Sequence, residues 1–446
     1  MLLYACDALK NPLILENSDQ KTIEGSQFWL SLDNAAKIFP AVMSKDNSTV
    51  LRFTAVMKEA VRIKPLMKAL EETESRFPYF KVQLKRGFFW FYLEHIKHPV
   101  PVETDDNLLC RIFPKKRLLI RVLVFQNRLS VECSHILTDG TGAFEFLKSL
   151  LSLYTRHLDI SLPPDFQFRK PGDEISEEEY EDGYNRYFKE NIPPMIKRVK
   201  AFHLPWTLNP SPRFHVMKAF ISIEDIKVKA KEKGVSITDY LVSVYLFALK
   251  EIYEDYASYK SHAKNKFLRV QVPVNLRNIF PSQTMRNFSL FVMPELDMRL
   301  GHYSFDEIVK TVYHQMRLET DEKLINKNIA RNVGSEKKIY IRSIPLILKI
   351  LILKLKFYSL GSSQYSGVIT NLGKVKFPGE MMELIDHLVF TPPPPNKMLK
   401  VNCGVIGFRD KLILSFGNVT KSTELENRIL QFIEKQGIDV KKEEFQ

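Results

Sequence analysis

The sequence predicts a mixed α/β protein built from two pseudo-symmetric subdomains, each a mixed sheet flanked by helices. Three observations support this fold class. The chain has 446 residues, more than one ordinary core can organise. In both halves, segments with the pattern of strands alternate with segments with the pattern of helices, and hairpin turns join some of them. A stretch rich in proline and acidic residues separates them. We therefore divide the chain into a first subdomain at 1–165, a linker or surface crossover at 166–212, and a second subdomain at 213–446.

The first half is expected to begin its regular structure with a strand at Thr49–Met57, which is rich in β-branched and aromatic residues. A helix follows over Lys64–Phe77, with prolines near its start and just past its end. Two hairpins come next, turning at 85–87 and at 126–128. Apolar residues recur every three or four positions over Thr141–His157, which predicts a helix there.

The second half repeats this pattern. The stretch HVMKAFISI predicts a strand, and Ser236 or Thr238 is placed to cap the apolar helix DYLVSVYLFALKEIY. A strand FLRVQVPVNLR and a helix from about Phe305 to Lys323 follow. The chain then forms a last hairpin and a terminal helix at Thr423–Lys435.

The most apolar segment is Ile344–Tyr358, which lysines interrupt at positions 349, 354 and 356. It is too short and too charged to span a bilayer. We predict a mostly buried helix between the two halves. The alternative is a basic amphipathic helix that makes peripheral contact with a membrane through 344–358.

Composition limits the function classes. The 45% hydrophobic and 26% charged residues are typical of a globular protein. The net charge of +13 suits an anionic partner, but lysines and arginines are spread out and no nucleic-acid-binding signature appears, so we expect no nucleic acid. The N-terminal residues lack the pattern of a signal peptide, and the cysteines form no CxxC pair, so a cytoplasmic location is expected. The four cysteines are Cys6, Cys110, Cys133 and Cys403.

The stretch SHILTDG places His135 just after a predicted strand and Asp139 four residues later, followed by Gly140 and Gly142. Histidine exchanges protons near neutral pH, so His135 is a candidate general base at a rigid strand end. Gly140 can adopt positive φ, and both glycines allow close approach to the backbone. The alternatives are a structural histidine and a metal pair. A metal site is disfavoured because no HExxH or Cys/His cluster supplies further ligands, and no phosphate loop or GxSxG motif is present.

SHILTDG resembles the HxxxDG motif of the acyltransferases built on the chloramphenicol acetyltransferase fold. That superfamily includes alcohol O-acetyltransferases, related plant acyltransferases and the condensation domains of nonribosomal peptide synthetases. Further stretches, in the same order along nearly the whole chain, also resemble this superfamily: RFPYFKVQLKRGFFWFYLE, VQVPVNLRNIFPSQTMRNFS, IPLILKILILKL with VITNLGKVKFP, and LILSFGNVTKSTELENRILQFIEKQG. Ser134 stands where condensation domains carry another histidine, and SFGNV lacks the tryptophan of the plant motif. The resemblance is therefore to the bacterial alcohol acetyltransferase-like branch.

The resemblance implies two chloramphenicol acetyltransferase-like subdomains with an active-site tunnel at their interface. It implies that His135 is the general base and that Asp139 pairs with Arg277 to fix the turn. Thr370 and Asn371 are candidates for contacts to the thioester or its oxyanion.

The implied activity is acyl transfer, most simply acetyl transfer, from acyl-CoA to a small alcohol or amine. No metal and no cofactor beyond the acyl-CoA donor are expected, and two fused halves suit a monomer. The alternatives are a donor bound to a carrier protein and a non-catalytic binding or membrane-surface module of the same fold.

Overall fold

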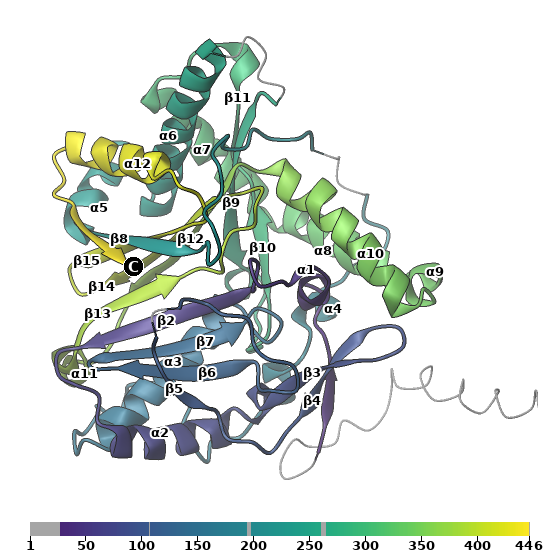
Figure 1. The fold of residues 1–446 in the computed structure, drawn as a ribbon, viewed down its shortest axis with the longest axis vertical. Helices are drawn as coiled ribbons and strands as arrows, with labels where there is room; N and C mark the ends of the chain where they lie inside the picture. Colours follow the sequence, from purple (N-terminus) through teal and green to yellow (C-terminus); the bar gives the residue numbers. More distant parts are fainter. Residues whose placement is uncertain (1–26, 107, 194–197, 260–264, 446) are drawn as a thin grey trace, which may run out of the picture.

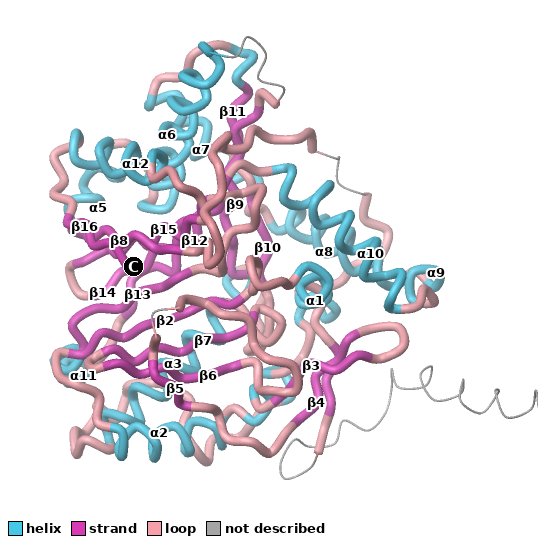
Figure 2. The backbone as a smooth tube through the Cα atoms, in the orientation of Figure 1, coloured by secondary structure: helices cyan, strands magenta, loops and turns pink. Residues whose placement is uncertain are grey.

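The computed structural model describes residues 27–445 apart from 107, 194–197 and 260–264, so Cys6 and the rest of the N-terminal stretch lie outside the described residues. Three sheets organise the described part of the chain (Figures 1 and 2). Helices flank the two larger sheets, as the predicted fold class requires.

The first large sheet has five strands in the order β13-β2-β7-β6-β5. Its strands are β2 (Val50–Met57), β5 (Val102–Thr104), β6 (Ile120–Phe125), β7 (Arg128–Ser134) and β13 (Ile385–Thr391). The helices α2 (Ile63–Arg76) and α3 (Gly140–Arg156) pack on each other and share one hydrophobic core with this sheet. These elements match the strand, hairpin and helices predicted for the first half.

The second large sheet has eight strands, with the order β10-β9-β12-β14-β15-β8-β16 and β11 paired to β9. Its strands are β8 (His215–Ser222), β9 (Phe267–Asn275), β10 (Ser289–Val292), β11 (Glu295–Asp297), β12 (Gly367–Val375), β14 (Val401–Phe408), β15 (Lys411–Asn418) and β16 (Lys441–Phe445). Four helices contribute to its core and lie together in Figure 1, namely α5 (Ile223–Glu232), α6 (Ile237–Tyr259), α7 (Phe305–Glu319) and α12 (Glu424–Lys435).

Strand β13 joins the two halves. It belongs to the second half in sequence, yet it pairs antiparallel with β2 along the edge of the first sheet. Phe390 of β13 packs on Phe53 of β2 with ring centroids 4.9 Å apart. On the other side, Gly404 of β14 lies so close that an added Cβ would stand 2.8 Å from Phe390. The two subdomains therefore meet along β13, between β2 and the second sheet (Figure 1).

The crossover between the halves is more deeply packed than we predicted. Its Glu179 is buried and forms an ion pair of 2.7 Å with Arg76 of α2. Tyr184 of the short helix α4 (Gly183–Arg186) is also buried and packs edge-on against Phe288, with ring centroids 5.3 Å apart. The sequence predicts a linker or surface crossover here and does not predict these buried contacts, because they depend on tertiary partners that the polar composition of the segment does not indicate.

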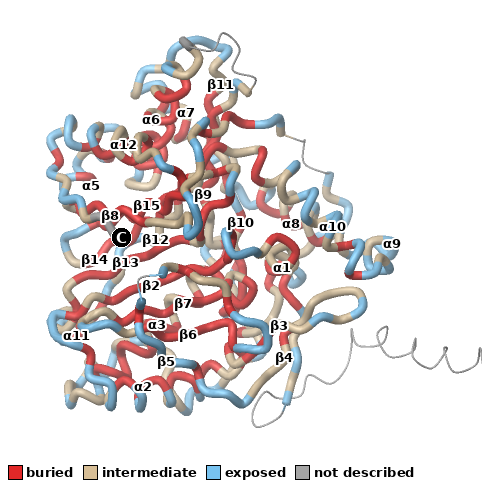
Figure 3. The backbone as a smooth tube through the Cα atoms, in the orientation of Figure 1, coloured by how far each residue is buried: buried red, intermediate tan, exposed pale blue. Residues whose placement is uncertain are grey.

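A third, small sheet lies beside α1 (Phe39–Val42) and has the order β1-β4-β3, with β1 (Trp29–Ser31), β3 (Val82–Arg86) and β4 (Phe91–His95). Near it stand α8 (Glu322–Lys337), α9 (Ile339–Arg342) and α10 (Leu346–Lys356), while α11 (Gly379–Leu384) precedes β13. The prediction of a mostly buried helix at Ile344–Tyr358 is wrong: α10 lies on the periphery with most of its leucines and isoleucines exposed (Figures 1 and 3). No described helix is long and apolar enough to cross a membrane.

Candidate active site

His135 follows directly on β7, where the strand fixes the position of its backbone. Its backbone N–H donates to the carbonyl of Thr49 over 2.7 Å, and Thr49 holds a left-handed backbone with φ of 57°. The imidazole stacks on Phe39 of α1, with ring centroids 4.8 Å apart and an interplanar angle of 28°. His135 is half-buried, so a reacting group can still reach it.

Asn287 fixes the tautomer of His135. Its Oδ1 lies 2.8 Å from Nδ1 of the imidazole. Its Nδ2 donates to Asp33 Oδ2 over 3.0 Å and to the His135 carbonyl over 3.1 Å. Both amide protons face acceptors, so the oxygen must face Nδ1, and Nδ1 must carry the imidazole proton. Nε2 then bears the lone pair, and it has no hydrogen-bond partner among the described residues.

Asp33 anchors this network from the interior. It is fully buried, and its Oδ1 accepts from the Ala36 N–H over 2.8 Å while Arg286 stands 3.6 Å from Oδ2. Burial raises the pKa of Asp33, although the Arg286 charge and the Asn287 hydrogen bond oppose that rise. Burial and the Asp33 charge raise the pKa of the neighbouring Asp182 to about 6. The carboxyl group of Asp33 thus sits where it can hold the Asn287 amide in one orientation.

Asp139 does not face the imidazole; it caps α3 and pairs with Arg277. Its Oδ1 accepts from the N–H groups of Thr141 and Gly142, at 3.1 Å and 3.2 Å. Its Oδ2 accepts from Arg277 Nη1 and from the Phe288 N–H, both at 2.9 Å. The Asp139 carboxylate therefore links the first subdomain to Arg277 and to Phe288, which precedes strand β10.

Arg277 extends the link into the loop that carries Asn287. Its Nε donates to the Thr284 carbonyl over 2.9 Å and its Nη2 to the Arg286 carbonyl over 2.6 Å. A planar guanidinium can serve several acceptors in fixed directions, so Arg277 shapes the loop backbone rather than only adding charge. Asp139 and Arg277 thus act on His135 indirectly, by positioning Asn287.

The glycine that the packing requires is Gly142. An added Cβ there would lie 2.2 Å from the Met285 carbonyl oxygen and 2.2 Å from Thr138 Oγ1. Gly140 begins α3, and an added Cβ would meet only Leu372, at 3.4 Å. Gly140 is not among the described glycines with positive φ. The role that we predicted for Gly140 is wrong, because the loop around Met285 approaches the second glycine instead.

Thr370 and Asn371 lie on β12, and the structure does not place either in the His135 network. Asn371 Nδ2 donates to Thr238 Oγ1 over 3.0 Å, and its Oδ1 accepts from the Gly373 N–H over 2.9 Å. The amide of Asn371 is therefore already used in shaping the turn. Leu372 is the β12 side chain that reaches the start of α3.

Asn287, Asp33 and Phe39 contact or support His135, and the sequence analysis selected none of them. Asn287 lies within the segment VQVPVNLRNIFPSQTMRNFS, but one sequence offers no signal that separates it from the segment's other polar residues. Asp33 and Phe39 lie about 100 residues before His135, in a region without a motif.

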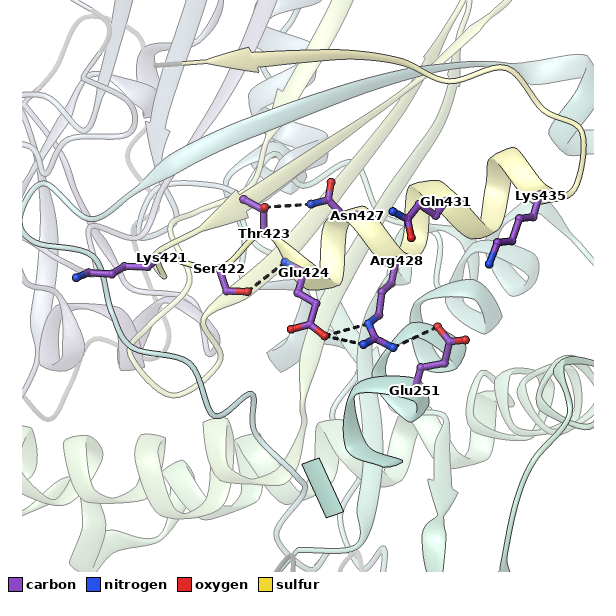
Figure 4. Close-up of a pocket in the computed structure, with 9 residues that line it drawn as sticks. All are labelled: Glu251, Lys421, Ser422, Thr423, Glu424, Asn427, Arg428, Gln431 and Lys435. Atoms are coloured by element: carbon purple, nitrogen blue, oxygen red, sulfur yellow. Dashed lines mark hydrogen bonds and ion pairs between the residues drawn. The ribbon is translucent and has the colours of Figure 1, made fainter. Parts of the chain in front are cut away.

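Two hollows in the surface of the described residues lie away from the His135 network. One hollow of about 600 Å³ lies between α6 and α12 (Figure 4). Its lining is polar, and Arg428 forms ion pairs there with Glu424 and Glu251. A second, of about 490 Å³, adjoins Trp29 and Tyr92 of the small sheet. Neither includes a residue of the His135 network, so the predicted tunnel at the interface stays a prediction.

No protein-family model matches the chain, and no curated protein sequence matches it. Solved structures do match over nearly its whole length. Trichothecene 15-O-acetyltransferase from Fusarium sporotrichioides has a TM-score of 0.59 at 10% identity, covering 93% of this chain and 96% of that one. The epimerization domain of tyrocidine synthetase B has a TM-score of 0.56 at 12% identity, covering 94% and 97%.

The wax ester synthase/diacylglycerol acyltransferase from Marinobacter aquaeolei has a TM-score of 0.53 at 12% identity, covering 91% of this chain and all of that one. Another F. sporotrichioides structure, complexed with coenzyme A and T-2, has a TM-score of 0.57 at 12% identity, covering 94% and 100%. At these identities the likeness shows the fold alone. The predicted two-subdomain fold is confirmed, and it is one that acyltransferases and synthetase domains share.

Proposed function

We propose that the chain is an acyltransferase that moves an acyl group from a thioester to an alcohol, with His135 as general base. The observation that carries the proposal is the Asn287 contact, which leaves the Nε2 lone pair of His135 without a partner among the described residues. A histidine held in that tautomer presents Nε2 as the atom that accepts a proton in general base catalysis.

In the proposed reaction, Nε2 removes the proton of the acceptor hydroxyl as its oxygen attacks the thioester carbonyl. The tetrahedral intermediate collapses with cleavage of the C–S bond, and the imidazolium returns its proton to the leaving thiolate. The acceptor oxygen gains the acyl group and the thiolate gains the acceptor's proton, so the reaction needs no further reagent. General base catalysis of this kind contributes roughly 10²–10⁴-fold to the rate. The Nδ1–H bond to Asn287, backed by Asp33, supports the transient imidazolium.

Acyl-CoA is the proposed donor and acetyl the simplest acyl group. The net charge of +13 suits a phosphorylated donor, and a protein of the same fold was solved with coenzyme A. A thioester bound to a carrier protein is the alternative donor. We propose that the protein needs no further cofactor and acts as a monomer. We also propose a cytoplasmic location, which the buried free thiols of Cys110, Cys133 and Cys403 support.

The test is release of free CoA from acetyl-CoA with a panel of alcohols and amines. We expect His135→Ala to lower the rate by roughly 10²-fold or more, while a control at the exposed His98, His98→Ala, keeps it. Equal rates for wild type and His135→Ala would refute the mechanism. Turnover with carrier-bound but not free acyl-CoA would select the alternative donor. Failure with both donors would favour a non-catalytic role for the fold.

A further inference from the structure

Helix α10 exposes apolar side chains that a surface helix usually buries, and it buries one of its three lysines. Ile347 is 74% exposed, whereas Lys349 is 2% exposed. In a water-soluble helix the apolar stripe faces the core and lysines face solvent. Five aliphatic side chains of α10 are exposed on its outer side, namely Ile347, Leu348, Leu351, Ile352 and Leu355.

Lys349 holds three segments together beneath this helix. Its Nζ donates to the carbonyls of Phe89 and Arg342, at 3.1 Å and 3.3 Å, and stands 3.8 Å from the ring centre of Trp90. Burial lowers the pKa of Lys349 to about 8. The backbone N–H of Leu346 also donates to the Phe88 carbonyl over 2.9 Å. The β3–β4 turn, α9 and α10 therefore form one fixed unit.

The turn and α9 enlarge the exposed apolar surface. Phe88 is 73% exposed at the β3–β4 turn, and Ile339 and Tyr340 of α9 are also exposed. We call the outer side of α10, with these three residues, the apolar face. Helices α9 and α10, which carry most of these residues, lie at the periphery of the molecule (Figure 1). An exposed apolar patch of this kind marks an interaction surface.

Positive charge surrounds the apolar face. Residues 337–358 contain six lysines and arginines and no aspartate or glutamate. Five of these six are exposed: Lys337, Lys338, Arg342, Lys354 and Lys356. The surface is therefore complementary to an apolar partner that carries negative charge at its border.

Two other occupants fit this surface less well. A second copy docked by a twofold axis would bring the same cations together without an acid from this segment to neutralise them. Protein interfaces favour aromatic residues, methionine and arginine and are depleted in lysine, whereas here leucine, isoleucine and lysine dominate. Lysines beside exposed aliphatics suit a lipid surface, because their stems cover apolar area while the ammonium groups reach the headgroups.

We propose that the apolar face docks the protein on the surface of an anionic membrane, with α10 lying in the plane of the headgroup boundary. The 11 residues of α10 span only about 16 Å, about half of a hydrocarbon core of about 30 Å, so the helix lies on the bilayer and does not cross it. The lysines contact anionic headgroups while the leucines and isoleucines enter the acyl boundary. This proposal stands whether or not the chain transfers acyl groups.

The test is co-sedimentation of the full chain with vesicles of phosphatidylcholine, with and without about 30% phosphatidylserine. We expect binding to the anionic vesicles, weakened by salt. The double variant Leu348→Glu, Leu351→Glu should lower the partition coefficient at least roughly tenfold. The charge variant Lys354→Glu, Lys356→Glu should lower it on anionic vesicles only.

The matched control carries the same change away from the face, at Leu300→Glu, Leu318→Glu, because both leucines are highly exposed. This control should bind as wild type does, and thermal unfolding checks that all variants fold. Absence of wild-type binding, or equal binding by the Leu348/Leu351 variant, would overturn the proposal. A dimer in size-exclusion chromatography that this variant abolishes, without vesicle binding, would assign the face to a second copy. Capture of an acidic carrier protein without vesicle binding would assign it to a protein partner.

Discussion

Asp33→Asn should change the tautomer of His135 without touching the imidazole. In the native network, turning the Asn287 amide over would place its oxygen against Asp33 Oδ2 and the His135 carbonyl, where donors now stand at 3.0 Å and 3.1 Å. Two donated hydrogen bonds would be lost, one to a buried carboxyl group. Together they are worth about 2–4 kcal/mol, a preference of at least about 30-fold for the Nδ1–H tautomer.

In the Asp33→Asn variant this preference disappears. The substituted side chain keeps its oxygen for the Ala36 N–H, so its amide nitrogen faces Asn287. Either orientation of Asn287 then makes two of the three hydrogen bonds available to it. We therefore expect the two tautomers in comparable amounts, and the competent fraction of His135 to fall from more than about 95% to about half.

Nitrogen NMR of protein with labelled histidine measures this directly, because protonated and lone-pair ring nitrogens resonate apart. His135→Gln assigns the signals, and Asp165→Asn, at an exposed aspartate, is the control. If the Asp33→Asn variant fails to fold, Asn287→Leu removes the acceptor and should likewise abolish the preference for Nδ1–H. A spectrum in which Nδ1–H still dominates in the Asp33→Asn variant would refute the reasoning.

Two further predictions concern stability. Gly142→Ala should lower the free energy of unfolding in urea by about 3 kcal/mol or more, because its Cβ would stand 2.2 Å from backbone and side-chain oxygens. The control Gly140→Ala should change it by less than about 1 kcal/mol. Equal effects of the two substitutions would contradict the close contact assigned to Gly142. Burial raises the pKa of Glu426 from 4.5 to about 7, so between these pH values the folded state keeps a proton that the unfolded chain releases. The free energy of unfolding therefore falls as pH rises from 4.5 to 7, by about 3 kcal/mol from this group. In Glu426→Gln this part of the slope should vanish in unfolding curves at pH 5 and pH 8, and an unchanged slope would exclude Glu426 as its source.

Local pattern predicted much of the fold. Strand β2, helix α2, the β6–β7 hairpin and the helix after SHILTDG follow from periodicity and turn residues, which act over short stretches of chain. The β3–β4 hairpin was also predicted, but its turn follows Arg86 instead of lying at 85–87, and strand β1 was missed. The choice of Asn287 and Asp33 as partners of His135 rests on contacts across 152 and 254 residues, and no local rule supplies them. The exposure of α10 was missed for another reason. Apolar composition predicts burial, but here the tertiary fold buries Lys349 and leaves the aliphatic side chains outside.

The placement of β13 has a consequence for how the protein is made. Strand β2 and its partner β7 are complete at Ser134, but β13, which pairs with the other edge of β2, ends at Thr391, more than 250 residues later. At about 5–20 residues per second, a ribosome needs roughly 13 to 51 seconds to supply β13. Throughout that interval the nascent first half presents an unpaired edge with the sequence VLRFTAVM, which can pair with another nascent chain. The strand that unites the two halves is therefore also the one whose late synthesis leaves this sheet edge open until the chain is almost finished.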